Sequence, residues 1–409
     1  MSDYVTWNTC RVCASSDLTP LFSLGEQYVS DFVEPGKEKN GHLCPIELDL
    51  CNNCTLVQQR HTAPQDFLYT RKYWYRSGVT QTMRDALRNI TEEIEQEVEL
   101  SFGDVVLDIG SNDGTLLRSY ADNPIIRVGV EPATNLAEQG QEGVDYFIND
   151  FWSYESYALL GLGKAKVITA IGMFYDLEDP NKFIGDVAKA LHANGIFVCQ
   201  LMCLKQTLDL ADVGNLAHEH LEFYSIRSLT ELFYRHGLEI QDIEENEING
   251  GSYRIIATHK ENSYYQNINA ISKVYDKERN LSNPDSYVPI ISQIEENRVR
   301  TNRFVRSAVA NGKRVWVYGA STKGNVLLQY YGLGKTLIEG AAERSPEKWG
   351  KVTIGTGIPI RSEAEAREAN PDYFLVLPYA FLDEFVERER LWRDGGGKFI
   401  VPLPELRIV

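Results

Sequence analysis

Four cysteines form two closely spaced pairs near the start of the chain. Cys10 and Cys13 make the first Cys-x-x-Cys pair, and Cys51 and Cys54 make the second. Four thiolates in this arrangement match the tetrahedral ligand set of structural zinc, a closed site that leaves no position for substrate. Disulfide bonds or ordinary buried cysteines are the alternative, but the three remaining cysteines suggest no disulfide framework. The pairs therefore predict a zinc-binding module whose metal supplies folding energy that so small a segment lacks.

A glycine-rich turn follows a strand-like run further along the chain. It reads Asp108-Ile-Gly110-Ser-Asn112-Asp-Gly114, and Glu131 stands at the end of the next strand-like run. This spacing differs from the GxGxxG dinucleotide fingerprint and resembles motif I of class I methyltransferases, which use S-adenosylmethionine (SAM). Gly110 would let the backbone approach the cofactor, while Glu131 would accept hydrogen bonds from both ribose hydroxyls. A carboxylate also suits the sulfonium charge, so the turn favours SAM over NAD.

Five further residues are candidates for the cofactor pocket. Asp150 and Phe151 fall where methyltransferases of this class often place a carboxylate near the adenine amino group and a ring beside it. Tyr75 and Ser77, in the segment KYWYRSG, and Met173, at the end of a strand-like run, are the other three. Aromatic side chains at these positions could equally belong to a hydrophobic core.

The segment NLAHEHLEFYS, at residues 215–225, gathers the candidates for catalysis. It contains His218, Glu219, His220 and Tyr224 just beyond a strand-like run. Because ligands of open α/β sheets bind beyond the carboxyl ends of the strands, this loop can reach the sulfonium methyl group. Histidine is partly neutral near pH 7 and can act as a base, with an adjacent carboxylate to fix its tautomer. The alternatives are polar residues that pack a domain junction, or a catalytic metal, although the spacing differs from HExxH.

A second glycine turn, VYGASTKGN, occupies residues 317–325. Its Ser321, Lys323 and Asn325 predict a site for a diphosphate, with a purely structural turn as the alternative. Arg254, in NGGSYR, could likewise pair with a phosphate or brace an interface. An NAD-linked sugar oxidoreductase using this turn is the least favoured hypothesis, because the turn lacks the GxGxxG spacing.

Alternating strand and helix patterns must position these residues. The pattern predicts an α/β fold with a mostly parallel, doubly wound sheet, preceded by a connecting helix that begins near Met83. Further helices are predicted from about Gly114 and over residues 179–195 and 225–239. Strands are predicted at residues 105–107, 127–130, 166–174, 196–202 and 250–259.

Three domains follow from these elements and from the length of 409 residues. We predict a small zinc-binding module at residues 1–70, a central class I methyltransferase Rossmann-like domain at 71–259 and a C-terminal Rossmann-like α/β domain at 260–409.

The formal charge of −17 argues against broad binding to nucleic acid or to an anionic membrane. The clearest basic cluster, at residues 296–306, is more typical of a solvated helix face than of a polyanion site. No apolar stretch approaches the length needed to cross a bilayer, and no signal peptide is recognisable. We therefore expect a soluble, cytoplasmic monomer or weak dimer without nucleic-acid or membrane partners.

Taken together, the motifs resemble the three-domain sugar C-methyltransferases, which methylate carbon on nucleotide-linked keto-deoxysugars. The resemblance covers nearly the whole chain and rests on the two Cys pairs, YxYRSG, LDIGSNDG, HEHLEFYS, NGGSYR, VYGASTKGN, PDYFLVLP and GGKFIVPLP. It implies a structural zinc domain, a central SAM domain, and a C-terminal domain that helps to hold the nucleotide sugar. By position it implies His220 as the general base and Glu219 as its neighbour, acting through an enolate that attacks the methyl group.

Two positions depart from the family pattern. Better-known members carry a tyrosine immediately before HEH, where this chain has Ala217, and a histidine after the fourth strand, where it reads MFYD. Tyr175 or Tyr224 would then have to compensate. Methyl transfer to a sugar oxygen or nitrogen therefore stays open, as does a non-catalytic zinc-containing SAM-binding scaffold.

Overall fold

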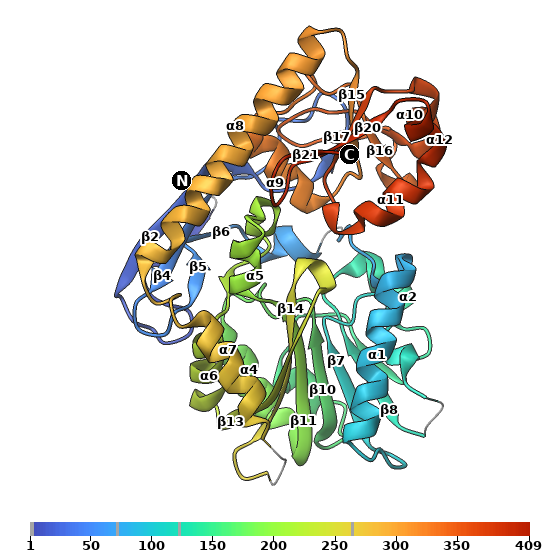
Figure 1. Cartoon of the computed structure of the whole chain (residues 1–409). Helices are drawn as coiled ribbons and strands as arrows, with labels where there is room; N and C mark the ends of the chain where they lie inside the picture. The colour runs from blue at the N-terminus through green and yellow to red at the C-terminus, as the bar shows by residue number, and fades with distance from the viewer. Residues whose placement is uncertain (1–3, 71–72, 122–123, 263–265) are drawn as a thin grey trace.

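The computed structural model describes residues 4–70, 73–121, 124–262 and 266–409. In Figure 1 the N-terminal strands lie beside a large central sheet, and the C-terminal segment forms a second α/β unit at the other end of the molecule. The predicted α/β class is confirmed. The predicted domain boundary at residue 71 falls on residues 71–72, which lie outside the described residues.

The N-terminal module contains an antiparallel sheet whose last strand comes from far along the chain. The order is β12-β5-β4-β2, with β2 (Leu18–Tyr28), β4 (Leu43–Cys51), β5 (Val57–Gln59) and β12 (Glu222–Phe223). A small ribbon pairs β1 (Val5–Thr6) with β6 (His61–Thr62). Since β12 directly follows the HEH segment, this sheet incorporates the loop predicted to be catalytic.

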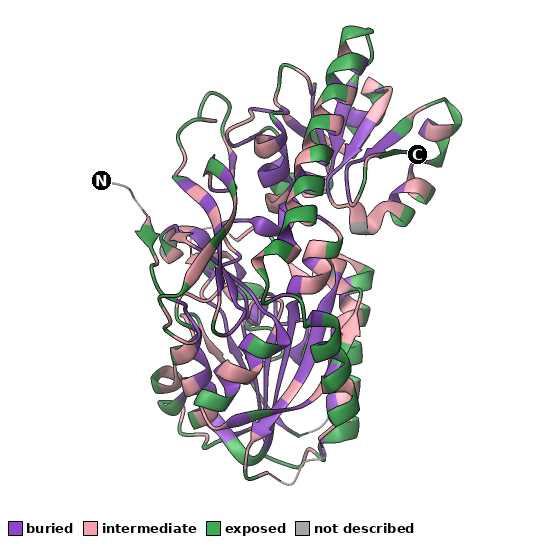
Figure 2. Cartoon of the chain, turned by 60° about the vertical axis from the view of Figure 1, so that its left-hand side comes forward, coloured by how far each residue is buried: buried purple, intermediate pink, exposed green. Residues whose placement is uncertain are grey.

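The central sheet has seven strands in the order β13-β14-β11-β10-β7-β8-β9. They are β7 (Val105–Ile109), β8 (Ile126–Val130), β9 (Tyr146–Ile148), β10 (Ala165–Ile171), β11 (Leu191–Met202), β13 (Leu238–Asn246) and β14 (Ser252–His259). The strands from β11 to β9 pair in parallel, whereas β14 and β13 add an antiparallel edge. Their apolar runs are buried, as the purple core of Figure 2 shows, because helices cover the parallel strands.

Local signals explain most of the central helices. They are α1 (Gln81–Glu97), α2 (Ala137–Gly140), α3 (Tyr154–Ala158), α4 (Pro180–Ala190), α5 (Leu204–Asp209), α6 (Ile226–Arg235) and α7 (Ile268–Glu278). Ser225 caps the start of α6 and forms a capping box with Ser228. At the start of α4, Asp179 accepts a hydrogen bond from the Lys182 amide, and Pro180 fits the first turn.

The predicted helices are longer than the observed ones. The helix expected over residues 225–239 ends at Arg235, because the chain enters β13 at Leu238. The helix expected from about Gly114 is only a 3-10 turn at Leu117–Ser119. The reason is that α1 packs on this face of the sheet, where Leu87 and Ile90 share a core cluster with Leu117. The helix expected over residues 179–195 ends at Ala190, because the chain already enters β11 there.

The C-terminal unit is a second, mostly parallel sheet in the order β18-β16-β15-β19-β20-β21. Its strands are β15 (Val315–Tyr318), β16 (Ala341–Glu343), β18 (Ile360–Ser362), β19 (Tyr373–Val376), β20 (Lys398–Val401) and β21 (Arg407–Ile408). The helices are α8 (Val288–Ala310), α9 (Thr322–Tyr331), α10 (Glu363–Ala369), α11 (Leu382–Arg388) and α12 (Arg390–Asp394). Strand β17 (Val352–Thr353) pairs with β3 (Phe32–Val33), which ties this unit to the N-terminal module.

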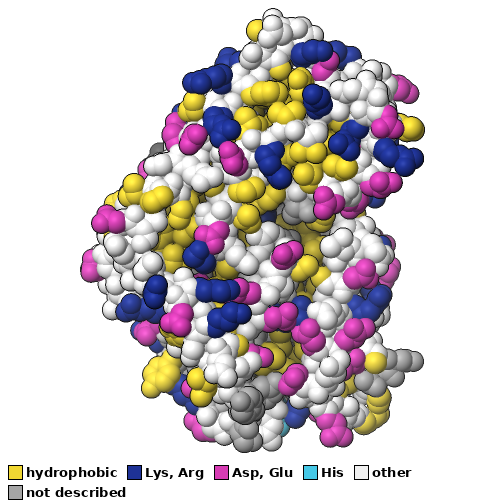
Figure 3. Space-filling view, viewed as in Figure 1, with side chains coloured by type: hydrophobic (Ala, Val, Ile, Leu, Met, Phe, Trp, Pro, Cys, Tyr) yellow, Lys and Arg dark blue, Asp and Glu magenta, His cyan; other side chains and the backbone are white. Residues whose placement is uncertain are grey.

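The surface carries its charges in mixed order. On the face shown in Figure 3, Lys and Arg side chains are interspersed with Asp and Glu. The basic residues of 296–306 lie on α8, where Arg298 and Arg300 form ion pairs with Glu295 and Glu296. Among the described residues, no helix combines the length and the apolar character needed to cross a membrane.

Candidate active site

The four predicted metal ligands lie together. The sulfur atoms of Cys10, Cys13, Cys51 and Cys54 are within 4.8 Å of one another, and their thiols are free. The Cys10 and Cys54 sulfurs are 3.5 Å apart, as are those of Cys13 and Cys51. A tetrahedral zinc ion with Zn–S bonds of about 2.3 Å would separate its sulfur ligands by roughly 3.8 Å. The cluster therefore fits a closed structural zinc site.

A cavity of ≈ 710 Å³ opens at the carboxyl ends of the central strands. Among the residues that line it are most of those predicted for the cofactor, namely Tyr75, Ser77, Gly110, Asn112, Glu131, Asp150, Phe151 and Met173. Its size suits a nucleoside-sized ligand. The cavity lies where the fold predicts a cofactor, beyond β7 and β8.

Backbone geometry shapes the floor of this cavity. Gly110 has φ +73°, and a Cβ atom there would lie 2.7 Å from Cγ of Met173, so the position requires glycine. One oxygen of Glu131 accepts a hydrogen bond from the Asn112 amide (2.9 Å) and the other from the Ala133 amide (2.8 Å). Burial raises the pKa of Glu131, which is 6% exposed. Each carboxylate oxygen retains further acceptor capacity for a ribose hydroxyl.

Two of the predicted cofactor residues lie outside the cavity lining. Asp108 is buried beneath the turn and accepts a hydrogen bond from Thr169 Oγ1 (2.6 Å). Burial raises its pKa to about 7. Gly114 has φ +77° and packs against Arg118 and the carbonyl oxygen of Gly140. Asp108 and Gly114 therefore support the glycine turn through buried contacts outside the cavity.

The glycine turn also holds the segment at residues 75–78, a role that sequence reasoning missed. The side-chain oxygen of Asn112 accepts from the Ser77 amide (3.0 Å), and Asp113 accepts from the Gly78 amide (2.8 Å). The sequence offers no local signal for this contact, because the segments are about 35 residues apart.

A second cavity, of ≈ 220 Å³, adjoins the first. Tyr73, Tyr75, Ser77, Ile171 and Gly172 line both cavities. The smaller cavity is also lined by Tyr175, Gln200, Met202, Glu219, His220 and Lys323. A substrate in this cavity would therefore meet a cofactor in the larger one.

His220 is held in a defined tautomer. Its Nδ1 lies 2.8 Å from the carbonyl oxygen of Asn215. Because a carbonyl can only accept, Nδ1 carries the hydrogen and the lone pair of the neutral ring is on Nε2. Burial and the nearby charge of Lys323 lower the pKa of His220 to about 3, so the imidazole is neutral at pH 7.

The other candidates from the HEH region occupy different environments. Glu219 lines the smaller cavity, and burial raises its pKa to about 7. The ring of Tyr175 contacts that of His220 edge-on at 4.8 Å, and burial raises the pKa of Tyr175, so its hydroxyl stays a donor. His218 instead lies outside both cavities and binds the carbonyl oxygen of Cys44 (2.9 Å). Tyr224 is fully buried and stacks on Phe174 at 5.3 Å, which makes it a core residue.

The predicted phosphate ligands are mostly engaged elsewhere. Ser321 caps α9 through the Gly324 amide, and Asn325 donates to the carbonyl oxygen of Asp31 (3.0 Å). Arg254 forms ion pairs with Glu93 and, at 3.6 Å, with Glu244, so it braces β14 against its neighbours. Lys323 differs from these three, since it reaches into the smaller cavity.

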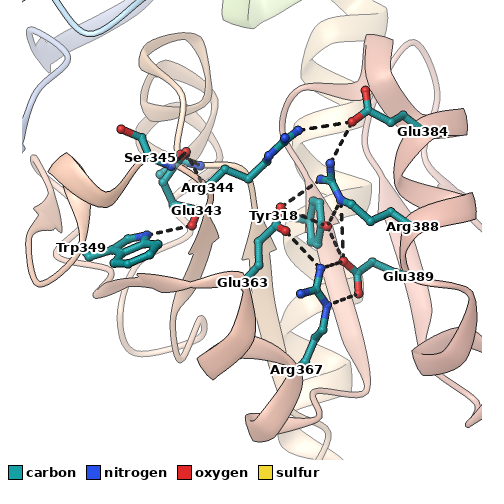
Figure 4. A network of polar contacts seen from close by, with 11 residues as sticks. Tyr318, Glu343, Arg344, Ser345, Trp349, Glu363, Arg367, Glu384, Arg388 and Glu389 are labelled. Carbon is teal, nitrogen blue, oxygen red and sulfur yellow. Dashed lines mark hydrogen bonds and ion pairs between the residues drawn. The ribbon is translucent and has the colours of Figure 1, made fainter. Parts of the chain in front are cut away.

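The second glycine turn is supported by an acidic residue that sequence reasoning did not find. Glu343, at the end of β16, accepts from the Ala320 amide (3.0 Å) and from the Arg344 and Ser345 amides (2.9 Å each). Figure 4 shows Glu343 beside Ser345, with Trp349 donating to its backbone. Like Glu131, Glu343 accepts hydrogen bonds from backbone amides beside a glycine turn, and it accepts from three of them.

The N-terminal module clamps the HEH loop. The Gln59 side chain donates to the carbonyl oxygens of Leu216 (3.3 Å) and Ala217 (3.1 Å). The backbone amide of Gln59 donates to the carbonyl oxygen of Leu221 (2.9 Å). Next to these contacts, buried Arg11 lies 3.7 Å from Glu222. The loop that carries His220 is therefore fixed by strands that follow the zinc cysteines.

Comparison with known proteins matches the chain segment by segment. Residues 10–69 match a family described as "Putative zinc binding domain", residues 76–243 a methyltransferase domain and residues 247–404 a C-methyltransferase C-terminal domain. The chain is also 29% identical over 406 residues to the C-methyltransferase NovU of Streptomyces niveus, covering 98% of this chain and 96% of that protein. The chain is a SAM-dependent methyltransferase. The cysteine cluster lies in the segment that matches the zinc-binding domain, and most of the lining of the larger cavity comes from the segment that matches the methyltransferase domain.

Solved structures give weaker matches. Magnesium protoporphyrin IX methyltransferase from Synechocystis PCC 6803 with bound SAH is 12% identical, covers 46% of this chain and 91% of its own, and has a TM-score of 0.36. A methyltransferase in complex with the Trm112 activator of Haloferax volcanii is 14% identical, with 43% and 95% coverage and a TM-score of 0.34.

Proposed function

We propose that this C-methyltransferase methylates a ring carbon next to a ketone in a nucleotide-linked deoxysugar, with His220 as the general base. The observation that carries the proposal is the neutral His220 ring, held by Asn215, in a cavity that joins the cofactor cavity. The relative's name, a C-methyltransferase, supports carbon as the acceptor. The division into residues 1–70, 71–259 and 260–409 belongs to this proposal and is supported by the three matched segments.

The chemistry assigns a step to each residue. SAM, when bound in the larger cavity, supplies an electrophilic methyl group. His220 Nε2 takes the proton from the carbon beside the ketone, and negative charge then develops on the ketone oxygen. The Tyr175 hydroxyl, which stays protonated, is placed as one donor for that oxygen. Glu219 lies in the same cavity and would stabilise the imidazolium that forms.

The test is a product analysis in deuterated water. The enzyme is incubated with SAM and a panel of nucleotide-linked 4-keto-deoxysugars, and the products are analysed by mass spectrometry and NMR. A gain of one methyl group with loss of the exchangeable α-proton supports carbon methylation. Methylation that leaves that proton exchangeable would move the acceptor to oxygen or nitrogen. SAM binding without turnover of any sugar would contradict the proposed substrate class.

A further inference from the structure

We propose that Lys323, supplied by the C-terminal unit, is a catalytic residue whose ammonium group binds the enolate oxygen of the substrate. This inference rests on the proposed function, because it requires a ketone next to the methylated carbon. In this proposal Lys323 binds the ketone oxygen next to the reacting carbon and does not bind a diphosphate.

The placement of Lys323 is set by the residue that also holds the base. Asn215, which is 1% exposed, accepts the His220 Nδ1 hydrogen with its backbone carbonyl oxygen (2.8 Å). Its side-chain oxygen accepts a hydrogen bond from Lys323 Nζ (2.6 Å). The buried Asn215 therefore holds both His220 and Lys323 in place. Both of these side chains line the same ≈ 220 Å³ cavity.

The ammonium group has donor capacity left for a ligand. It has three N–H donors, of which one is used by Asn215 and another points to the weak acceptor Sδ of Met202 at 3.6 Å. A remaining donor is available to an oxygen atom in the cavity. The backbone around the lysine is close-packed, since a Cβ atom on Gly214 would lie 3.2 Å from the Lys323 carbonyl oxygen.

The local charges favour a single developing oxyanion over a diphosphate. Burial lowers the pKa of Lys323, but Asp212, Asp176 and Glu219 oppose that shift and favour the ammonium form. Burial raises the pKa of Asp176 and of Glu219, and either carboxyl, once ionised, would repel a ligand carrying two or more negative charges. A neutral ketone that becomes an enolate can enter this environment, and its charge is then neutralised by the lysine.

The same cation explains how His220 becomes an effective base. In the free cavity the Lys323 charge disfavours protonation of the imidazole. Burial is the larger cause of the low pKa of His220, and the Lys323 charge adds to it. Once an enolate oxygen lies against the ammonium group, the Lys323 charge is compensated and its part of the opposition to a proton on His220 is removed. The lysine and histidine therefore act together on the two ends of the same C–C=O unit.

The step balances as follows. The C–H bond next to the ketone breaks, and its proton forms a new N–H bond at His220 Nε2. The C–H electron pair forms the C=C bond of the enolate, while the C=O π pair moves to oxygen, where the Lys323 N–H donates to it. With SAM bound, the C=C pair would form the new C–C bond to the methyl group while the oxygen pair re-forms C=O. The S–CH3 bond would break with its electron pair on sulfur, leaving S-adenosylhomocysteine, and His220 would release its proton to solvent.

The α/β scaffold of the C-terminal unit holds the lysine in place. Lys323 lies in the first turn of α9, directly after the Ser321 cap. The preceding residue of the turn, Ala320, is fixed on both sides, because its amide donates to Glu343 and its carbonyl oxygen accepts from Lys348 Nζ (2.7 Å). The Glu343 carboxylate, visible in Figure 4, thus holds the turn that positions the Lys323 side chain.

The experiment isolates proton abstraction from methyl transfer. Wild type, Lys323→Met, Lys323→Gln and Lys323→Arg are incubated without SAM, with S-adenosylhomocysteine present, with a nucleotide-linked 4-keto-deoxysugar in deuterated water. The rate of α-proton exchange at saturating sugar is followed by NMR. Lys335→Met is the control, since Lys335 lies in the same unit and pairs with Glu38 at the surface. Calorimetry of SAM binding and thermal melting check that each variant is folded.

We expect Lys323→Met and Lys323→Gln to exchange about 10²-fold more slowly than wild type, as for loss of one oxyanion donor, with SAM affinity unchanged. Lys323→Arg should recover part of the rate, and Lys335→Met should match wild type. A folded Lys323→Met variant that exchanges at the wild-type rate at saturation, with only KM raised, would overturn the proposal and return Lys323 to phosphate binding. Absence of exchange by wild type would refute the proposed ketone chemistry itself, and with it the role of Lys323.

Discussion

Two adjacent glutamines on β5 allow the coupling between the zinc module and the active site to be measured. Gln58 and Gln59 are both fully buried, and their side chains point to opposite faces of the strand. Gln58 holds the first cysteine turn, through the Arg11 amide (2.8 Å) and the Thr9 carbonyl oxygen (3.0 Å). Gln59 holds the HEH loop through two carbonyl oxygens.

We predict that Gln59→Leu reduces methyl transfer strongly, whereas Gln58→Leu reduces mainly stability. Each change removes two side-chain hydrogen bonds to backbone groups, so each should lower the free energy of unfolding by about 1–3 kcal/mol. Their effects on chemistry should differ, because only Gln59 bonds the carbonyl of Ala217, which itself accepts from the His220 amide (3.0 Å). A base displaced by about 1 Å can lose on the order of 10²-fold in rate.

The assay compares kcat, the Kd for SAM and urea unfolding for wild type and both variants under conditions where each is folded. For Gln59→Leu we expect kcat to fall about 10²-fold with the Kd for SAM within a factor of about two. For Gln58→Leu we expect kcat close to wild type and easier loss of zinc to a chelator. Equal kcat values for the two folded variants would refute the idea that the N-terminal module positions the catalytic loop.

Three other predictions follow from the site. His220→Ala should abolish turnover while leaving SAM affinity nearly unchanged, because His220 lies in the smaller cavity; measurable turnover by the purified variant would remove it as the base. Cys51→Ser should release the metal and lower Tm, and metal-free protein with an unaltered melting curve would contradict the zinc assignment. The pKa of Asp108 is raised to about 7 in the folded protein. Between about pH 4 and 7 the folded protein therefore binds more protons at Asp108 than the unfolded chain does, so the free energy of unfolding falls as pH rises through this range. Asp108→Asn should therefore flatten the decline by at most about 1.4 kcal/mol per pH unit, and identical pH profiles of Tm for variant and wild type would show that the carboxyl titrates normally.

The sequence was sufficient for those parts of the fold that depend on local pattern. Apolar runs predicted β7, β8 and β10, and the helical pattern from residue 225 predicted the start of α6. The extent of the helix after Gly114 could not be predicted, because it depends on α1 packing on that face of the sheet. The antiparallel edge formed by β13 and β14 also depends on pairing between strands, which periodicity does not specify.

Residues that line the two cavities were predicted where a single turn or a single loop supplies them. Gly110 and Glu131 line the cofactor cavity, and His220 and Glu219 line the smaller one. The separate roles of His218 and His220 could not be told apart, because both stand in the same loop and only tertiary contacts bury one of them against Cys44. Three contacts join residues more than 20 positions apart: Gln59 with Ala217, Glu343 with Ala320, and Lys323 with Asn215. Composition and residue spacing do not predict such contacts.

The pairing of β12 with β5 has a consequence for how the polypeptide is made. Residues 57–59 leave the ribosome about 160 residues before their partner at 222–223, so the N-terminal sheet keeps an open edge while most of the methyltransferase domain is synthesised. Zinc captured by the four cysteines can order this early segment, but its outermost strand arrives only with the loop that carries the histidines. A fragment that stops near residue 70 would leave the amide and carbonyl groups of β5 unpaired on that side, where another chain could add a strand. Completion of the N-terminal fold and formation of the active site are therefore the same late event in synthesis.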